Sequence, residues 1–205
     1  MPKNTFLELD EAKKEKITEA ALNEFAAYGY EISSTNRIVK ECGISKGSLF
    51  QYFENKEDLY FYLIDTVAKE MAEDMKPDIG KLPKNIKERI IEYSLREISW
   101  YMENPVKGRF MIGMASERGD IYKKTIERYG EKSSGIYEEL IKDAKFNGKA
   151  GTNEMSDALQ WVLKGYNEKF LKENDPDKTP LRKLEKKYVT GLSTYLDIIL
   201  QTGDS

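Results

Sequence analysis

The polar side chains with the clearest chemistry lie between Ser45 and Lys56, in the stretch SKGSLFQYFENK. They comprise hydroxyls, an amide, a phenol and ammonium groups, which donate hydrogen bonds or carry positive charge. Gly47 stands among them, although a glycine inside a helix costs about 1 kcal/mol relative to alanine. The stretch therefore indicates one of two features. Either another molecule or segment approaches the helix backbone closely at Gly47, or the turn there is unusual.

Catalytic chemistry has less support in this sequence. The chain contains no histidine and one cysteine, Cys42. The commonest general base and the usual Ser-His and Cys-His arrangements are therefore missing, and no Gly-rich phosphate motif is present. Cys42 is expected to be a small core residue, because nothing nearby would activate its thiolate. We expect no enzyme, no cofactor and no metal site, while tyrosine or lysine chemistry stays open.

Composition limits the architecture and the compartment. The chain has 205 residues, of which 40% are hydrophobic and 34% are charged. It can therefore bury a core in one large domain or in two smaller ones. No run reaches the roughly 18 apolar residues of a membrane span, and the N-terminus lacks the apolar region of a signal peptide. Together with the single cysteine, these features predict a cytoplasmic protein.

The charge distribution restricts how the chain could bind a polyanion. Its net charge is −3, so a general basic surface is not supported. Between Ser34 and Lys56, however, the bases Arg37, Lys40, Lys46 and Lys56 outnumber the acids Glu41 and Glu54 by two. Any contact with nucleic acid must be concentrated on that segment, and we include Arg37 in it.

The residue pattern predicts helices throughout, because strand-like alternation is rare and helix-forming residues dominate. Asp10 and Glu11 should start the first long helix, and Gly29 should end it in a left-handed conformation. Ser34, Ser45, Asn55 and Asn85 are expected to begin later helices. The other expected helices cover residues 110–115, 120–146, 154–172 and 181–201. The segment DMKPDIGKLPKN, with its prolines and glycine, predicts a boundary between two domains. The first would cover residues 1–75 and the second, also helical, residues 76–205.

The segments at 35–42 and after Ser45 form two short helices joined by a turn at Gly43 and Ile44. That is the sequence shape of a helix-turn-helix, whose second helix enters the major groove of DNA. A glycine at position 47 would let the backbone approach DNA, with Ser45, Lys46 and Ser48 as donors. The alternative, a simple loop and helix cap, stays open on spacing alone.

The run KITEAALNEFAAYGYEISSTNRIVKECGISKGSLFQYFENKEDLY resembles the N-terminal DNA-binding domain of TetR-family transcriptional repressors, over about the first 70 residues. The resemblance implies an all-α chain with a variable regulatory domain. It also implies that Ser34, Tyr52 and Lys56 contact phosphates. Four residues of the second short helix would face the groove: Lys46, Gly47, Ser48 and Gln51. Phe50 stands where tyrosine is common, so one family contact is expected to be missing.

The two last predicted helices carry apolar stripes that suggest a homodimer. Helix-turn-helix proteins usually bind two half-sites as dimers, and the resembling family pairs these helices in a four-helix bundle. A purely internal core remains the alternative. The residues expected at the interface are Leu159, Val162, Tyr166, Tyr188, Leu192, Tyr195 and Ile199.

A methionine- and aromatic-rich segment precedes these helices. Its position matches the effector-binding part of the family, which implies an apolar or aromatic small molecule. A filled core is the competing interpretation, because such side chains also pack well together. The expected ligand residues are Trp100, Tyr101, Phe110, Met111 and Met114, with Trp161 facing them.

The sequence thus predicts a ligand-responsive repressor that binds a palindromic operator in double-stranded DNA as a homodimer. It predicts no association with a membrane. A helical interaction protein that no longer binds DNA, or a small enzyme, would keep the same fold. The acidic balance of residues 1–60, with eight bases against eleven acids, leaves the first of these alternatives open.

Overall fold

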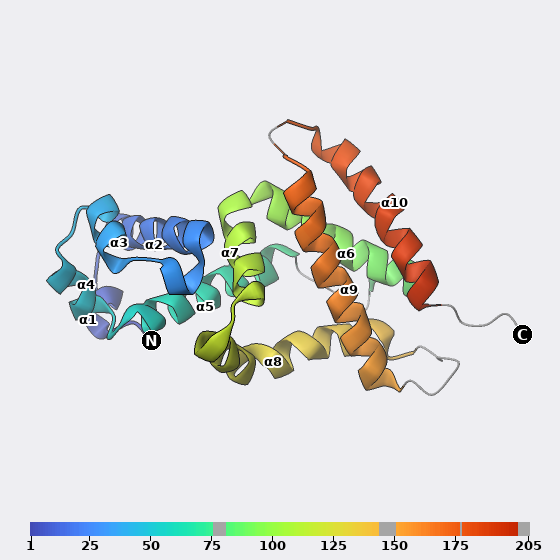
Figure 1. Cartoon of the computed structure of the whole chain (residues 1–205), viewed down its shortest axis with the longest axis horizontal. Coiled ribbons are helices and arrows are strands. Elements are labelled where there is room, and N and C mark those ends of the chain that lie inside the picture. Colours follow the sequence, from blue (N-terminus) through green and yellow to red (C-terminus); the bar gives the residue numbers. More distant parts are fainter. Residues whose placement is uncertain (76–80, 144–150, 177, 201–205) are drawn as a thin grey trace, which may run out of the picture. The chain divides into compact units, whose positions relative to one another are not determined.

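The structure is a computed structural model that describes residues 1–75, 81–143, 151–176 and 178–200, without the side chains of 130–134. The described chain is all-α, as predicted, and forms two compact units (Figure 1). The first unit comprises Met1–Asp74 and Asn104–Tyr122, and the second comprises Met75–Glu103 and Lys123–Ser205. The segment Asn104–Tyr122 therefore groups with the N-terminal unit, although the sequence-based division placed it after residue 75.

The first unit surrounds an aromatic core. Phe25 and Tyr60 are buried and their rings lie 5.0 Å apart, and Phe110 contacts Tyr60 in an edge-on arrangement at 5.5 Å. Phe110 belongs to α7, so this helix is part of the same core. The helices of the unit are α1 (Asn4–Leu7), α2 (Glu11–Ile32), α3 (Thr35–Cys42), α4 (Lys46–Tyr52), α5 (Lys56–Met75) and α7 (Pro105–Ser116).

Four helix starts expected from the sequence are confirmed by side-chain caps. Asp10 accepts a hydrogen bond from the backbone of Lys13 at 2.9 Å, and Ser45 accepts one from Ser48 at 3.0 Å. Asn55 caps α5 and Asn85 caps α6 (Ile86–Glu103) in the same way, at 2.8 and 3.1 Å. Each cap satisfies a backbone N–H that has no partner within its helix.

The predicted end of the first long helix is wrong in detail. Gly29 has the expected positive φ of 68°, but its ψ of 179° is extended and not left-handed helical. The chain bends there and continues helically to Ile32. The N–H of Tyr30, which the bend frees, donates to Glu117 at 2.6 Å. The bend is thus held by a carboxylate 87 residues away, which no local pattern could indicate.

We expect Gly29→Ala to destabilise the first unit by about 2 kcal/mol, because this φ/ψ region is essentially restricted to glycine. The new Cβ would also lie 3.1 Å from the Glu117 carboxylate. Thermal denaturation would show a melting temperature lower by about 4–8 °C. Gly135→Ala is the matched control, because that glycine is helical and a Cβ there would meet open space. Equal melting temperatures for the two variants would contradict the argument.

The second unit packs its helices around apolar stripes. Leu163 of α9 and Leu192 of α10 are fully buried, as is Ile90 of α6. The Cβ that any other residue would place at Gly191 would overlap the hydroxyl of Tyr166, so glycine allows α9 and α10 to approach closely. The helices are α6 (Ile86–Glu103), α8 (Gly119–Ile141, its first residues in the first unit), α9 (Thr152–Glu173) and α10 (Leu181–Ile199).

The predicted helix bounds in this unit agree within a few residues. The expected helix over 120–146 ends at Ile141, and residues 144–150 lie outside the described part of the chain. The last helix, expected over 181–201, ends at Ile199, and residues 201–205 lie outside the described part of the chain. The short helix α1 was not predicted.

Candidate nucleic-acid interface

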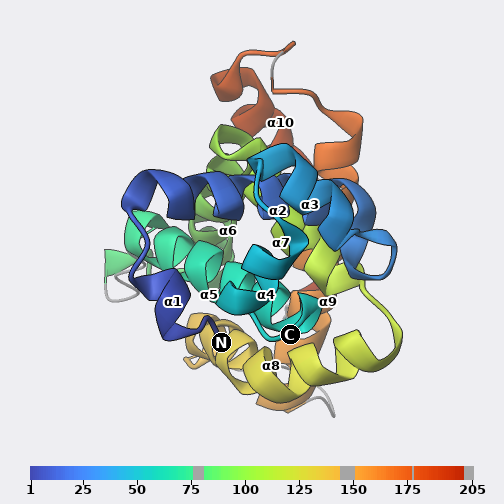
Figure 2. The same cartoon turned by 90° about the vertical axis from the view of Figure 1, so that its left-hand side faces the viewer.

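Helices α3 and α4 form the predicted helix-turn-helix (Figure 2). Gly43 ends α3 in the left-handed conformation, with φ 68° and ψ 33°, a backbone shape that glycine adopts without strain. The N–H of the next residue, Ile44, donates to the carbonyl of Val39 at 3.0 Å. Ser45 then caps α4, so the turn is only two residues long.

Helix α4 has one buried face and one exposed face. Leu49 and Tyr52 are buried, and Phe53, which follows the helix, is 1% exposed. Lys46, Gly47 and Gln51 are exposed, and Ser48 is half-buried beside Ser45, with their hydroxyl oxygens 2.8 Å apart. The exposed face therefore presents a cation, hydroxyls and an amide, together with a glycine at which a Cβ would meet the Ser45 hydroxyl at 3.7 Å. This arrangement agrees with the residues expected to face a groove.

Helix α1 and the residue before it hold the C-terminal end of α4. The Lys3 ammonium donates to the carbonyl of Phe50 at 3.0 Å, and the Lys3 backbone N–H donates to the carbonyl of Tyr52 at 2.8 Å. The Thr5 hydroxyl donates to the carbonyl of Gln51 at 2.5 Å. The last carbonyls of a helix have no partner within it, so these contacts fix the position of a seven-residue helix. The pairs lie more than 45 residues apart, which is why the sequence did not reveal them.

Arg37 is occupied by an ion pair within the first unit. Its guanidinium donates to both carboxylate oxygens of Glu24, at 2.5–3.0 Å, and to the carbonyl of Ile32. It also stacks on the ring of Tyr28, 4.4 Å from the centroid. Glu24 is buried and further accepts the backbone N–H of Ser34 at 2.8 Å. The arginine thus joins α3 to α2, a structural role that the sequence had not indicated.

Lys56 likewise has protein partners where a phosphate contact was predicted. Its ammonium donates to the carbonyls of Tyr30 at 2.6 Å and Ser33 at 3.2 Å, and lies over the Tyr30 ring at 4.4 Å. These carbonyls belong to the bent end of α2, where a cation is stabilised by the helix dipole. The lysine therefore closes the end of α2 in this structure.

Two further expectations concern Ser34 and Tyr52. Ser34 is the N-cap residue of α3, but its hydroxyl makes no capping hydrogen bond. The Tyr52 ring is 7% exposed and packs on Phe6, with centroids 6.1 Å apart. The ring of Tyr52 is thus part of the core, while the role of its hydroxyl in phosphate binding stays a prediction.

The predicted dimer residues fall into two groups in the second unit. Leu159, Tyr188 and Leu192 are buried within their own unit. Val162, Tyr166 and Ile199 are half-buried, and Tyr195 is 41% exposed. Two exposed apolar residues on the same helices are not among the predicted dimer residues. Ile198 is 65% exposed, and Trp161, which was expected at the ligand site, is 70% exposed.

The predicted ligand residues are divided between the two units. Trp100 and Tyr101 are buried in the second unit, and Phe110 is buried in the core of the first. Met111 and Met114 are half-buried on α7. Trp161 is largely exposed on α9, so it does not face a buried aromatic cluster within its unit.

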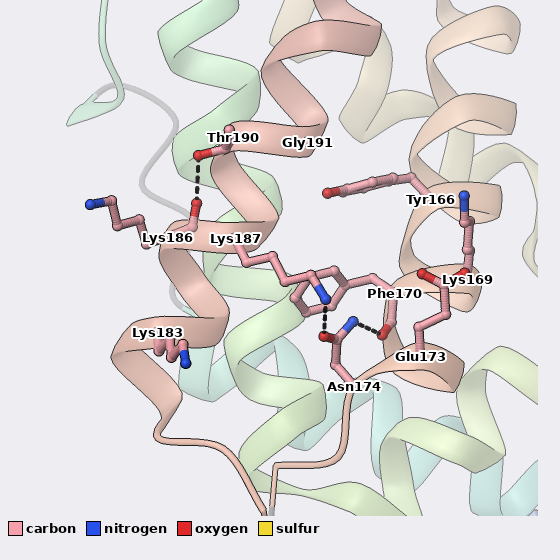
Figure 3. Close-up of a pocket in the computed structure, with 10 residues that line it drawn as sticks. All are labelled: Tyr166, Lys169, Phe170, Glu173, Asn174, Lys183, Lys186, Lys187, Thr190 and Gly191. Carbon is pink, nitrogen blue, oxygen red and sulfur yellow. Dashed lines mark hydrogen bonds between the residues drawn. The ribbon is translucent and has the colours of Figure 1, made fainter.

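The second unit has a surface cleft of about 510 Å³ between α9 and α10 (Figure 3). Its walls carry Tyr166 and Phe170, with Lys169, Lys183, Lys186 and Lys187 around the opening. The Lys187 ammonium donates to the Asn174 side chain at 2.7 Å, and Asn174 donates to the Phe170 carbonyl at 2.6 Å. Apart from Tyr166, which the sequence placed at the dimer interface, none of the predicted site residues lines this cleft.

Membrane and metal sites have no support in the described residues. None of their helices combines the length and the apolar character needed to cross a bilayer. They contain no cluster of three or more potential metal-ligating His, Cys, Asp or Glu side chains.

Comparison with known proteins identifies the N-terminal domain. Residues 17–63 match the model of "Bacterial regulatory proteins, tetR family". The uncharacterized HTH-type transcriptional regulator YhgD of Bacillus subtilis is 32% identical over 71 residues, which are 33% of this chain and 37% of YhgD. The alignments with YhgD and the Bacillus subtilis fatty acid metabolism regulator protein thus span only about a third of those proteins, 37% and 33%.

Solved structures share the fold over nearly the whole chain. A TetR family transcriptional regulator from Chloroflexus aurantiacus covers 98% of this chain with 97% of its own, at a TM-score of 0.73 and 22% identity. The transcriptional regulator FadR of Bacillus subtilis, solved with stearoyl-CoA, covers 87% of this chain with 97% of its own, at a TM-score of 0.65 and 17% identity. The helix-turn-helix and the family match identify an N-terminal DNA-binding domain of the TetR family of regulatory proteins, and the chain shares the fold of solved TetR family regulators.

Proposed function

We propose that the protein is a cytoplasmic, ligand-responsive repressor that binds a palindromic operator as a homodimer. The observation that carries the proposal is the exposed start of α4, where Lys46, Gly47 and Gln51 face solvent beside two serine hydroxyls. Phosphate contacts position such a helix on DNA, and contacts to base edges give it specificity. Buried Leu49 and the α1 contacts hold it rigidly enough for both.

A second copy of the chain is the partner we infer for the outer faces of α9 and α10. Trp161 and Ile198 are the most exposed apolar residues there, and Tyr195 continues the same stripe as Ile198, three residues earlier. Large exposed apolar residues that lie together mark interaction surfaces. Val162 and Tyr166 extend the surface on α9.

Two copies joined in this way would hold two recognition helices about 34–36 Å apart, one turn of DNA. An effector that binds one arrangement of the dimer better than the other shifts the population and changes operator affinity by the same free energy. FadR of Bacillus subtilis, which shares the fold, was solved with stearoyl-CoA, and this supports a regulator that responds to a small-molecule ligand.

The proposal is tested by operator binding of two α4 variants, measured by fluorescence anisotropy on DNA from upstream of the protein's own gene. Lys46→Ala is expected to weaken binding to operator and scrambled duplexes alike. It should also lower the slope of log affinity against log salt by about one per half-site. Gln51→Ala is expected to keep the slope and to lose about 1–3 kcal/mol of discrimination at one base pair in each half-site.

The two variants serve as controls for each other, because both side chains are exposed and lie on the same short helix. Wild-type protein that binds operator and scrambled duplexes equally would argue against a repressor. Wild-type protein that binds neither duplex would favour the interaction-protein alternative. Identical behaviour of the two variants would reject the separate roles given to Lys46 and Gln51.

A further inference from the structure

A buried carboxylate lies at the centre of the second unit. Glu97 of α6 is 9% exposed and accepts hydrogen bonds from the Tyr101 hydroxyl and from the Asn167 amide of α9, both at 3.1 Å. The Asn167 oxygen in turn accepts from the Tyr188 hydroxyl of α10 at 2.5 Å. One polar chain therefore joins α6, α9 and α10 inside an otherwise apolar core.

The described residues supply this carboxylate with no cation. Its hydrogen-bond donors are a phenol and an amide, and no lysine or arginine pairs with it in the described part of the chain. Burial raises the pKa of Glu97, against the lowering effect of the two hydrogen bonds. A buried carboxylate without a counter-charge costs several kcal/mol when ionised, which core stability alone does not require. A glutamine or a leucine would fill the same space at lower cost.

Four tyrosines from three helices are affected by the charge of Glu97. Tyr93 and Tyr101 come from α6, Tyr188 from α10 and half-buried Tyr137 from α8. Burial raises the pKa values of all four phenols, and the Glu97 charge adds to this effect. Trp100 adjoins Tyr101 with ring centroids 5.8 Å apart.

A further polar atom of α6 lies beside this cluster. The Ser94 hydroxyl is one turn before Glu97 and fully buried; it makes no hydrogen bond of standard geometry within the described residues, but it is close enough to the Tyr188 phenol to lower its pKa. Buried charges in native structures are usually paired. The Glu97 carboxylate, which has no counter-charge among the described residues, is therefore the group that a ligand would complete.

We propose that Glu97, with Tyr93, Tyr101, Tyr137 and Tyr188, binds the cationic head of an organic amine or quaternary ammonium effector. The inference deepens the proposed function, because it names the chemical class of the ligand to which the repressor responds. The carboxylate supplies the charge, and the tyrosine rings supply faces that attract a cation. An anionic ligand would be repelled from this position, and a neutral one would gain nothing from the carboxylate.

The site is placed where it can influence the first unit through the chain itself. Glu97 lies in α6, and only Asn104 separates the end of α6 from the start of α7. Helix α7 packs in the core of the first unit through Phe110. A cation between α6 and its neighbours would therefore act on a helix that leads directly into that core.

Proton linkage provides a signature for the proposed site. A bound cation favours the ionised form of Glu97, whose pKa is raised in the free protein, so binding should release a proton. Affinity for a cation should therefore increase with pH, by at most about tenfold per pH unit, until Glu97 is ionised in the free protein.

The test uses the full chain and benzyltrimethylammonium as the probe, with neopentylbenzene as its uncharged isostere. Calorimetric titration in two buffers of different ionisation enthalpy measures affinity and proton release together. Wild-type protein is expected to bind the cation with proton release and increasing affinity at higher pH, and to bind the isostere at least about tenfold more weakly. Glu97→Gln should lose at least about tenfold in cation affinity and all of the pH dependence. Glu88→Gln, an exposed position on the same helix, should change neither.

The wild-type measurements decide the matter even if Glu97→Gln fails to fold. No cation binding, equal binding of the isostere, or binding without proton release would each overturn the inference. Tighter binding of stearoyl-CoA than of the cation would overturn it as well. Operator affinity is measured separately, so cation binding by a protein that does not bind DNA would reject the proposed function and leave this site standing.

Discussion

Trp161→Glu is expected to turn the dimer into a monomer and to lower operator affinity by more than about a hundredfold. Trp161 is the most exposed large apolar side chain among the described residues of the second unit, at 70%. A tryptophan at the centre of a dimer interface commonly contributes more than about 2 kcal/mol to the free energy of association. A glutamate buried there without a partner would add a desolvation cost. A monomer would contact one half-site only, so both effects follow from one substitution.

Two other substitutions separate assembly from folding. Tyr122→Glu places the same charge at another exposed aromatic, 42% exposed on α8, and should leave the dimer intact. Leu192→Glu introduces it at a fully buried position and should unfold the second unit. Sedimentation velocity gives the mass, and circular dichroism gives the helix content. A wild-type monomer, or a dimer that tolerates Trp161→Glu, would contradict the proposed interface.

Local features of the sequence predicted most of the fold. The caps at Asp10, Ser45, Asn55 and Asn85 are confirmed because each depends on a residue three positions away. The helix-turn-helix could be recognised for the same reason, since its turn, its cap and the partner of the cap lie within the six consecutive residues 43–48. Exposure of the α4 start follows from the same local pattern.

Roles that depend on distant partners could not be predicted. The sequence predicts Arg37 and Lys56 as cations near DNA, and the structure adds Glu24 and the end of α2 as their protein partners. Glu97 was overlooked because a glutamate within a helical pattern usually lies in solvent, and only the packing of α6 against α9 and α10 shows that it is buried. Trp161 was assigned to a pocket because its residue type fits a core and an interface equally well.

Among these residues, Lys56 has the most informative contacts. Its ammonium binds the carbonyls of Tyr30 and Ser33 and lies over the Tyr30 ring. The bent end of α2 cannot satisfy these carbonyls within its own helix, so the lysine replaces the missing donors. Glu117 holds the N–H of the same Tyr30 at 2.6 Å, and one peptide segment is thus fixed from both sides.

Lys56→Met is therefore expected to lower the free energy of unfolding by about 2 kcal/mol, because charged donors to buried carbonyls contribute about 1.5–3 kcal/mol. The melting temperature should fall by about 4–8 °C. The salt slope of operator binding should stay unchanged, since no phosphate contact is removed. Lys46→Met is the matched control: its lysine is exposed, so it should keep the melting temperature and lower the slope by about one per half-site. If the two variants exchanged these effects, Lys56 would be the phosphate contact and the end of α2 would be held by other groups.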